Sequence, residues 1–128
     1  MSRFDKYGPI AGGFRAPLNA AITSADVGKI QAVSINGSGK AVIGGPAETA
    51  IMGVIVATRP MAANEPIDIM TSGEIVEATM TGGTAFTAGA IVYGHAAGTV
   101  DATATAGKII AKMVELDRMV VRCPIATT

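Results

Sequence analysis

Apolar runs of strand length, separated by clusters of Gly, Pro, Asn and Ser, follow one another from residue 22 onward. Residues 51–57 form the longest uninterrupted apolar stretch, which predicts a strand buried on both faces. Residues 67–71 instead alternate apolar and polar side chains, the pattern of a strand with one face in the core. The one helical expectation is a single turn at residues 47–50, directly after Pro46.

Further strands are expected at residues 29–35, 40–43, 74–77, 90–93, 99–101, 108–115 and 118–123. Asn36-Gly37 between the first two strands predicts a hairpin, and Leu116-Asp117 predicts a second hairpin between the last two. Short strands at a spacing of about 8–12 residues, punctuated by glycine, indicate an all-β fold. We therefore expect a small barrel or β-tulip-like domain over residues 21–128.

A weak internal repeat accompanies this pattern. The similar segments are 25–28 with 87–90, 39–42 with 98–101, the run at Ile51 with that at Ile109, and the strand at Ile67 with that at Met119. The offset between the two halves shrinks along the chain, so we expect loops of different length. Chance similarity in an Ala- and Gly-rich sequence is the alternative explanation.

Residues 1–20 differ from the rest of the chain. They contain Phe4, Tyr7 and Phe14, three of the five aromatic residues, interleaved with Gly and Pro that exclude a regular period. We expect an extended arm, which could span up to roughly 65 Å, whose aromatic side chains insert into a partner. Phe4, Tyr7, Phe14 and Arg15 are the candidate contact residues. The alternative is that the arm lies on its own core.

Charge and composition narrow the classes of binding partner that the chain could have. Ten Lys and Arg balance ten Asp and Glu, which argues against nucleic acid or an anionic membrane as a partner. Hydrophobic residues make up 49% and charged residues only 16% of the chain, so it is not a disordered sequence. So low a charge predicts that much of the surface is either neutral, built from Ala, Thr and Gly, or covered by another subunit.

Candidate chemistry is sparse. The N-terminus lacks an apolar signal segment and no run is long enough for a membrane helix. A single Cys123 and a single His95 cannot make an internal disulfide or a structural zinc site, so we expect Cys123 to be a small buried hydrophobe. Residues 37–40 lack the remaining positions of a phosphate-binding loop.

His95 lies in an expected turn with no nucleophile nearby in sequence, and it is interpreted as an exposed turn histidine. Glu74 and Glu77 are three residues apart, which would place them on opposite faces of a strand. The sequence therefore predicts no catalytic residue, no cofactor site and no metal site, and a protein that is not an enzyme.

The second half resembles the capsid decoration, or head-stabilising, proteins of tailed bacteriophages. The resemblance rests on residues 87–93, 97–100 and 107–112, supported by 52–57 and 65–69, and it extends over roughly residues 22–124. It implies a compact β domain that forms homotrimers at three-fold positions of the capsid, bound to the major capsid protein. It also implies location on the capsid surface of the virion after synthesis in the bacterial host cytoplasm.

In such a trimer, the three N-terminal arms would bind the capsid together, because each raises the effective concentration of the others.

Two other functions remain open at this point. One is another phage structural part, such as a head fibre, spike or tail component. The other is a small β-barrel ligand-binding module or enzyme, for which His95 with Asp101 is the only candidate pair.

Overall fold

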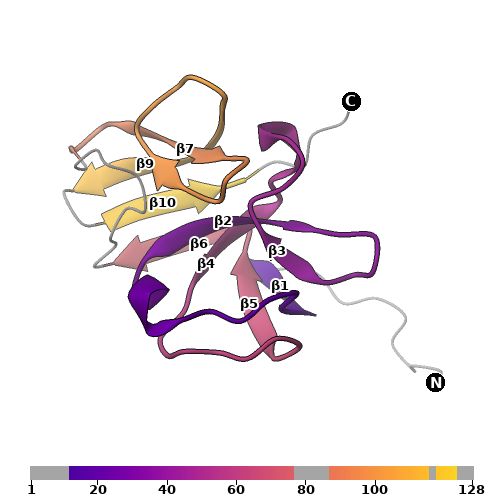
Figure 1. Cartoon of the computed structure of the whole chain (residues 1–128). Helices are drawn as coiled ribbons and strands as arrows, with labels where there is room; N and C mark the ends of the chain where they lie inside the picture. The colour runs from indigo at the N-terminus through magenta and orange to yellow at the C-terminus, as the bar shows by residue number, and fades with distance from the viewer. Residues whose placement is uncertain (1–11, 77–86, 116–117, 124–128) are drawn as a thin grey trace, which may run out of the picture.

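Two five-stranded antiparallel sheets make up the fold in this computed structural model (Figure 1), which describes residues 12–76, 87–115 and 118–123. The first sheet contains β1 (Gly13–Pro17), β2 (Ile30–Ile35), β3 (Ala41–Ile43), β4 (Gly53–Val56) and β5 (Pro66–Met70). The second contains β6 (Ser72–Val76), β7 (Ile91–His95), β8 (Val100–Asp101), β9 (Gly107–Glu115) and β10 (Arg118–Arg122). Two short 3₁₀ helices, η1 (Ser24–Asp26) and η2 (Glu48–Ala50), interrupt the connections of the first half. The all-β expectation is confirmed, as is the helical turn after Pro46.

The two halves of the chain have the same topology. The strand order is β1-β5-β4-β2-β3 in the first sheet and β6-β10-β9-β7-β8 in the second, so adding five to each strand number converts one into the other. The internal repeat predicted from the sequence is thereby confirmed. The connection from β4 to β5 spans residues 57–65, whereas only residues 116–117 join β9 to β10, which explains the last and largest decrease in the offset.

Corresponding hairpins share their backbone detail. The loops 36–40 and 95–99 are each closed by a hydrogen bond of 3.0 Å, donated by the N–H of the first residue to the C=O of the last. Gly39 and Gly98 occupy the same loop position with φ of 77° and 92°, a region that side chains other than glycine rarely adopt. The predicted Asn-Gly hairpin is therefore present, with a loop of five residues.

Thr71 joins the two units of the repeat, of which the first contains β1–β5 and the second β6–β10. Its N–H donates to the C=O of Gly12 at 2.9 Å, and its own C=O accepts from the N–H of Cys123 at 2.8 Å. The residue that follows the last strand of each unit thus bonds to the residue that precedes the first strand of that unit. The chain passes from one sheet to the other through this single residue.

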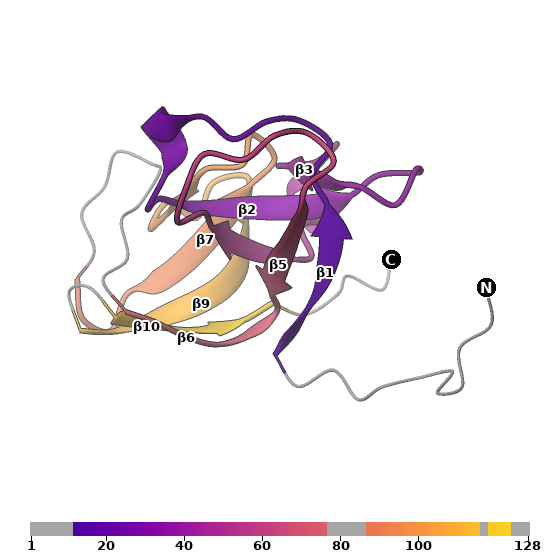
Figure 2. The ribbon, with the colours of Figure 1, turned by 90° about the horizontal axis from the view of Figure 1, so that it is seen from below.

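The sheets bury one core between them and a second beneath the first sheet. Between the sheets, Ala32 and Val54 of the first pack with Val92, Ile110 and Met119 of the second. The far side of the first sheet is covered by its own connections, which contribute buried residues at 18, 22 and 57. Figure 2 shows these connections, in indigo and rose, running along that side.

Part of the predicted arm belongs to the domain. Residues 13–17 form β1, which pairs with β5 along its whole length, and Leu18 just beyond it is fully buried. Gly13 has no side chain, which lets its backbone lie directly against the carbonyl of Ile69. Pro17 stands at the end of an edge strand, where a missing N–H is tolerated. Glycine and proline, which argued against a strand here, therefore fit this particular edge.

Candidate functional site

The four predicted arm contacts do not form one patch in the described structure. Phe4 and Tyr7 lie outside the described residues. Phe14 and Arg15 are neighbours in β1, so their side chains leave opposite faces of the sheet. Phe14 packs, partly buried, against the core beneath the first sheet, as in the alternative in which the arm lies on its own domain. Arg15 is exposed.

Arg15 forms an ion pair with its cross-strand neighbour Asp68, with 2.8 Å between Nε and Oδ1. The hydrogen bond and the charge of Arg15 lower the pKa of the Asp68 carboxyl, and the same contacts raise the pKa of Arg15. The side chains are 66% and 78% exposed, so water and salt screen the pair and it adds little to stability.

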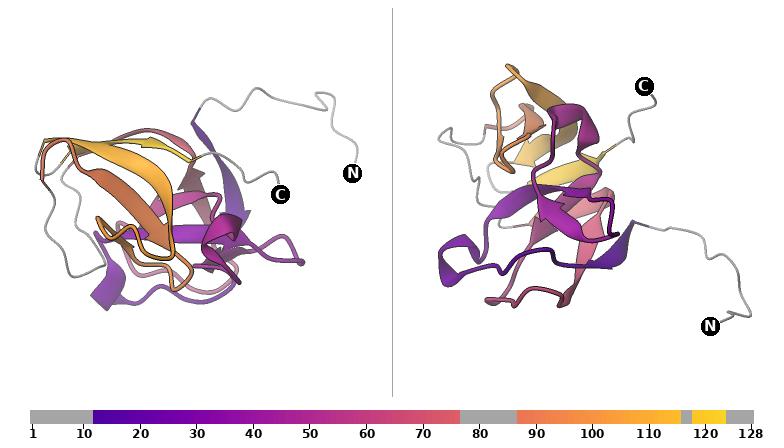
Figure 3. Two further views of the ribbon diagram at one scale, coloured as in Figure 1. Left: turned by 90° about the horizontal axis from the view of Figure 1, so that it is seen from above. Right: turned by 45° about the vertical axis from the view of Figure 1, so that its right-hand side comes forward.

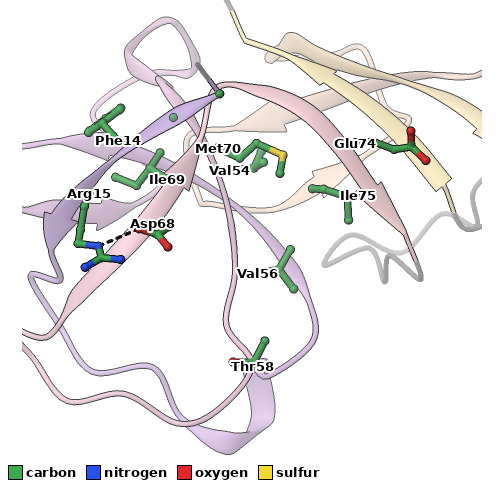
Figure 4. A pocket seen from close by; sticks show the side chains of 12 residues that line it. Phe14, Arg15, Val54, Val56, Thr58, Asp68, Ile69, Met70, Glu74 and Ile75 are labelled. Atoms are coloured by element: carbon green, nitrogen blue, oxygen red, sulfur yellow. Dashed lines mark hydrogen bonds and ion pairs between the residues drawn. The ribbon is translucent and has the colours of Figure 1, made fainter. Parts of the chain in front are cut away.

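A pocket of about 580 Å³ lies beside this pair, between the first sheet and β6 (Figure 4). Its apolar part includes Val54, Val56 and Ile75. Its charged residues are Arg15 and Asp68, already paired, and Glu74, which accepts a hydrogen bond from Arg118 at 3.2 Å. Because these charged groups have partners, the pocket offers an apolar hollow without the free converging polar groups that position a substrate.

His95 is not the exposed turn residue that the sequence suggested. Its Nε2 lies 2.7 Å from Oδ1 of Asp101, its Nδ1 lies 3.0 Å from the C=O of Ala106, and its side chain is only 14% exposed. The reason is that β7 continues through His95 while the segment after β8 folds across the ring. Both ring nitrogens are engaged, so the ring fastens this segment to β7 and has no free nitrogen for a ligand.

Cys123 is buried, as expected. Burial raises the pKa of its thiol, and the nearby charge of Lys108 opposes this to a smaller degree. Nζ of Lys108 donates a hydrogen bond of 2.6 Å to the C=O of Ile51, so the lysine crosses from the second unit to the first. Within the part of the chain that the structure describes, no three His, Cys, Asp or Glu side chains gather as metal ligands. None of the described helices has the length and hydropathy of a membrane span.

The outer face of the second sheet is the feature that the sequence reasoning missed. Ile91, Ile109, Val114 and Val120 are 42–55% exposed, and they are the only exposed large hydrophobic residues in the described ranges. They line a hollow of about 710 Å³ together with Lys112 and Arg122. We call these six residues the open face; strands β7, β9 and β10 carry it on one side of the molecule (Figure 3, orange to yellow). The signal was available in residues 119–121, three consecutive apolar residues in a strand.

Comparison with known proteins identifies the fold. No protein-family model matches the chain, and no curated protein does. A solved structure from Mycobacterium phage Patience is similar with a TM-score of 0.74 and 19% sequence identity, and the match covers 94% of this chain and 95% of that one. At this identity the likeness establishes a shared fold over most of both chains.

Proposed function

We propose that this chain is a structural protein of a phage particle that decorates and stabilises the outer surface of the capsid. It binds the major capsid protein and acts as a homotrimer at three-fold positions, bridging neighbouring capsomers. The host cytoplasm supplies the chain, and the virion surface is where it works.

The observation that carries this proposal is the fold shared with a phage protein over 94% of this chain and 95% of that one. The resemblance of residues 22–124 to decoration proteins narrows the role within the particle. An exposed apolar sheet face supports it further, because such faces on small proteins mark contacts with other proteins.

A non-enzymatic role is part of the proposal. The one pair that could have acted as a general base, His95 with Asp101, is held in place by the C=O of Ala106. The pocket beside β1 has paired charged groups. Neither arrangement presents a nucleophile or base to a substrate.

Quantitative mass spectrometry of gradient-purified particles from the source tests the proposal. Decoration of the whole lattice predicts a ratio near one copy of this chain per major capsid protein. A few copies per particle would instead indicate a head fibre, spike or tail component. Absence from particles would overturn the structural role in either form.

A further inference from the structure

The open face corresponds to a surface that is buried elsewhere in the same molecule. In the first sheet, the equivalent face packs against the second sheet and forms the core between them. An added Cβ on Gly94 of β7 would lie 3.1 Å from the Cβ of Ala32 in β2, which shows how closely the sheets meet. In the second sheet the same face has no described element over it (Figure 3). Within residues 12–76, 87–115 and 118–123, the second copy of this packing face is therefore uncovered.

Backbone pairing fixes which residues correspond. The pair next to the loop is Ile35 with Ala41 in the β2–β3 hairpin and Gly94 with Val100 in the β7–β8 hairpin. Ala32 lies three residues before Ile35, and Ile91 lies three residues before Gly94, so these two positions correspond. The cross-strand partner of Ala32 is Val54, and the cross-strand partner of Ile91 is Lys112. Ala32 and Val54 are fully buried in the core between the sheets, whereas Ile91 and Lys112 are exposed.

A second pair of positions behaves in the same way. Met70 and Arg122 each end the last strand of their unit, immediately before the residue whose N–H bonds back to the start of that unit. Met70 packs against the core between the sheets, and Arg122 is exposed. The open face is therefore aliphatic at Ile91 and Val114, like the buried copy at Ala32 and Val56. It carries Lys112 and Arg122 where the buried copy has Val54 and Met70.

These cations have no described partner. Neither Lys112 nor Arg122 makes an ion pair with any described residue, and the nearby acids Glu74 and Glu115 are both paired with Arg118. A cation amid aliphatic side chains that lacks a partner among the described residues gains the most binding free energy from a surface that brings carboxylates and excludes water. We propose that the open face docks onto a protein surface that presents carboxylates among aliphatic side chains. This proposal rests on the proposed function and assigns the partner surface to the major capsid protein.

The same charges argue against other occupants. Two copies of this chain meeting through their open faces would bring Lys112 and Arg122 together with their counterparts, and like charges at such a contact are unfavourable. Continued stacking of sheets is also blocked, because the far side of the first sheet is already covered by residues 18–28 and 57–65. Membrane attachment commonly uses an amphipathic helix that buries one side, whereas these residues lie within a sheet.

The test compares variants on particles. Each variant replaces the wild-type chain during particle production, and its copies per major capsid protein are measured on gradient-purified particles. Lys112→Glu combined with Arg122→Glu is expected to lower occupancy at least about tenfold, as is Ile91→Ser combined with Val120→Ser. The charge-matched control is Lys29→Glu combined with Lys40→Glu, which lie away from the face and should leave occupancy within twofold of wild type. Thermal unfolding of each purified variant confirms that it is folded.

The outcomes separate the two proposals. Wild-type chain absent from particles overturns the proposed function, and with it the assignment of this face. Wild-type chain present, with folded open-face variants at equal occupancy, overturns this inference alone. Sedimentation equilibrium that shows self-association lost in these variants would assign the face to a second copy. Binding of wild type, but not the variants, to phosphatidylglycerol vesicles would assign it to lipid; either result contradicts the inference.

Discussion

Gly44, immediately after β3, lies against the carbonyl of Ala96 in the β7–β8 loop, so closely that an added methyl group would collide with the oxygen. The next residue, Gly45, donates its N–H to that same carbonyl at 2.9 Å. The hairpin loop of one unit is thus fastened to the strand end of the other. Because φ at Gly44 is 80°, the position excludes other residues both by backbone conformation and by contact.

Gly44→Ala is therefore expected to lower the free energy of unfolding by at least about 2 kcal/mol. Gly37→Ala is the matched control, because no atom lies within 4 Å of an added Cβ there and its φ is not positive. Urea unfolding followed by circular dichroism measures both. Equal stability of the two variants would show that the contact between the units contributes nothing.

His95→Ala is expected to cost about 1–3 kcal/mol of unfolding free energy, because Asp101 and the C=O of Ala106 lose a partly buried partner. A double-mutant cycle with Asp101→Ala isolates the pair, and we expect a coupling energy above about 0.5 kcal/mol. Additive effects would mean that the ring acts only by filling space.

Acid is expected to weaken the fold through two surface carboxyls. The pKa of Asp68 is lowered by Arg15, and the pKa of Glu65 is lowered by the N–H of Ala62 and by Arg59. A carboxyl whose folded pKa lies below its unfolded value stabilises the fold above the unfolded pKa, near 4, and this contribution disappears as pH falls through the folded pKa.

The measurement is urea unfolding at several pH values from 7 to 2. The free energy of unfolding should fall below about pH 5, and Asp68→Asn should make that fall shallower. The effect should be small and should shrink in molar NaCl, since both carboxyls are at the surface. A slope that Asp68→Asn leaves unchanged would contradict the assignment to this pair.

Cys123 is expected to resist thiol reagents in the folded protein. It is buried and its thiol pKa is raised, so both access and the thiolate fraction are low. Reaction with a disulfide reagent at pH 8 should be at least about tenfold slower than in urea-unfolded protein. Equal rates in the two states would contradict the burial.

Two truncations separate the arm from the domain. Removing residues 1–11 leaves β1 intact and should preserve the unfolding transition, while removing Phe4 and Tyr7 and so lowering particle binding. Removing residues 1–20 also deletes β1 and the buried Leu18, which we expect to destabilise the domain by several kcal/mol. Full particle binding by the shorter truncation would rule out Phe4 and Tyr7 as anchors.

The sequence by itself determined strands β2 to β10, the two hairpins and the repeat, because alternation, glycine turns and self-similar spacing are local signals. It also placed Cys123 in the core. Strand β1 was lost within the predicted arm because the suitability of Gly13 and Pro17 depends on the edge that they occupy. Only the tertiary structure decided that His95 is held by Asp101 and Ala106, since that contact needs the segment after β8 to fold back.

The open face shows most clearly the difference between what local sequence signals determine and what the tertiary structure decides. Its apolar positions and cations stand in the sequence at Ile91 and within residues 109–122. Nothing local distinguishes a strand buried on both faces from one that is left uncovered. That difference depends on which sheet packs on which, and within the described residues no third sheet covers the second one. Burial is a property of neighbours in space, so the sequence supplied the face and the tertiary structure decided that it is exposed.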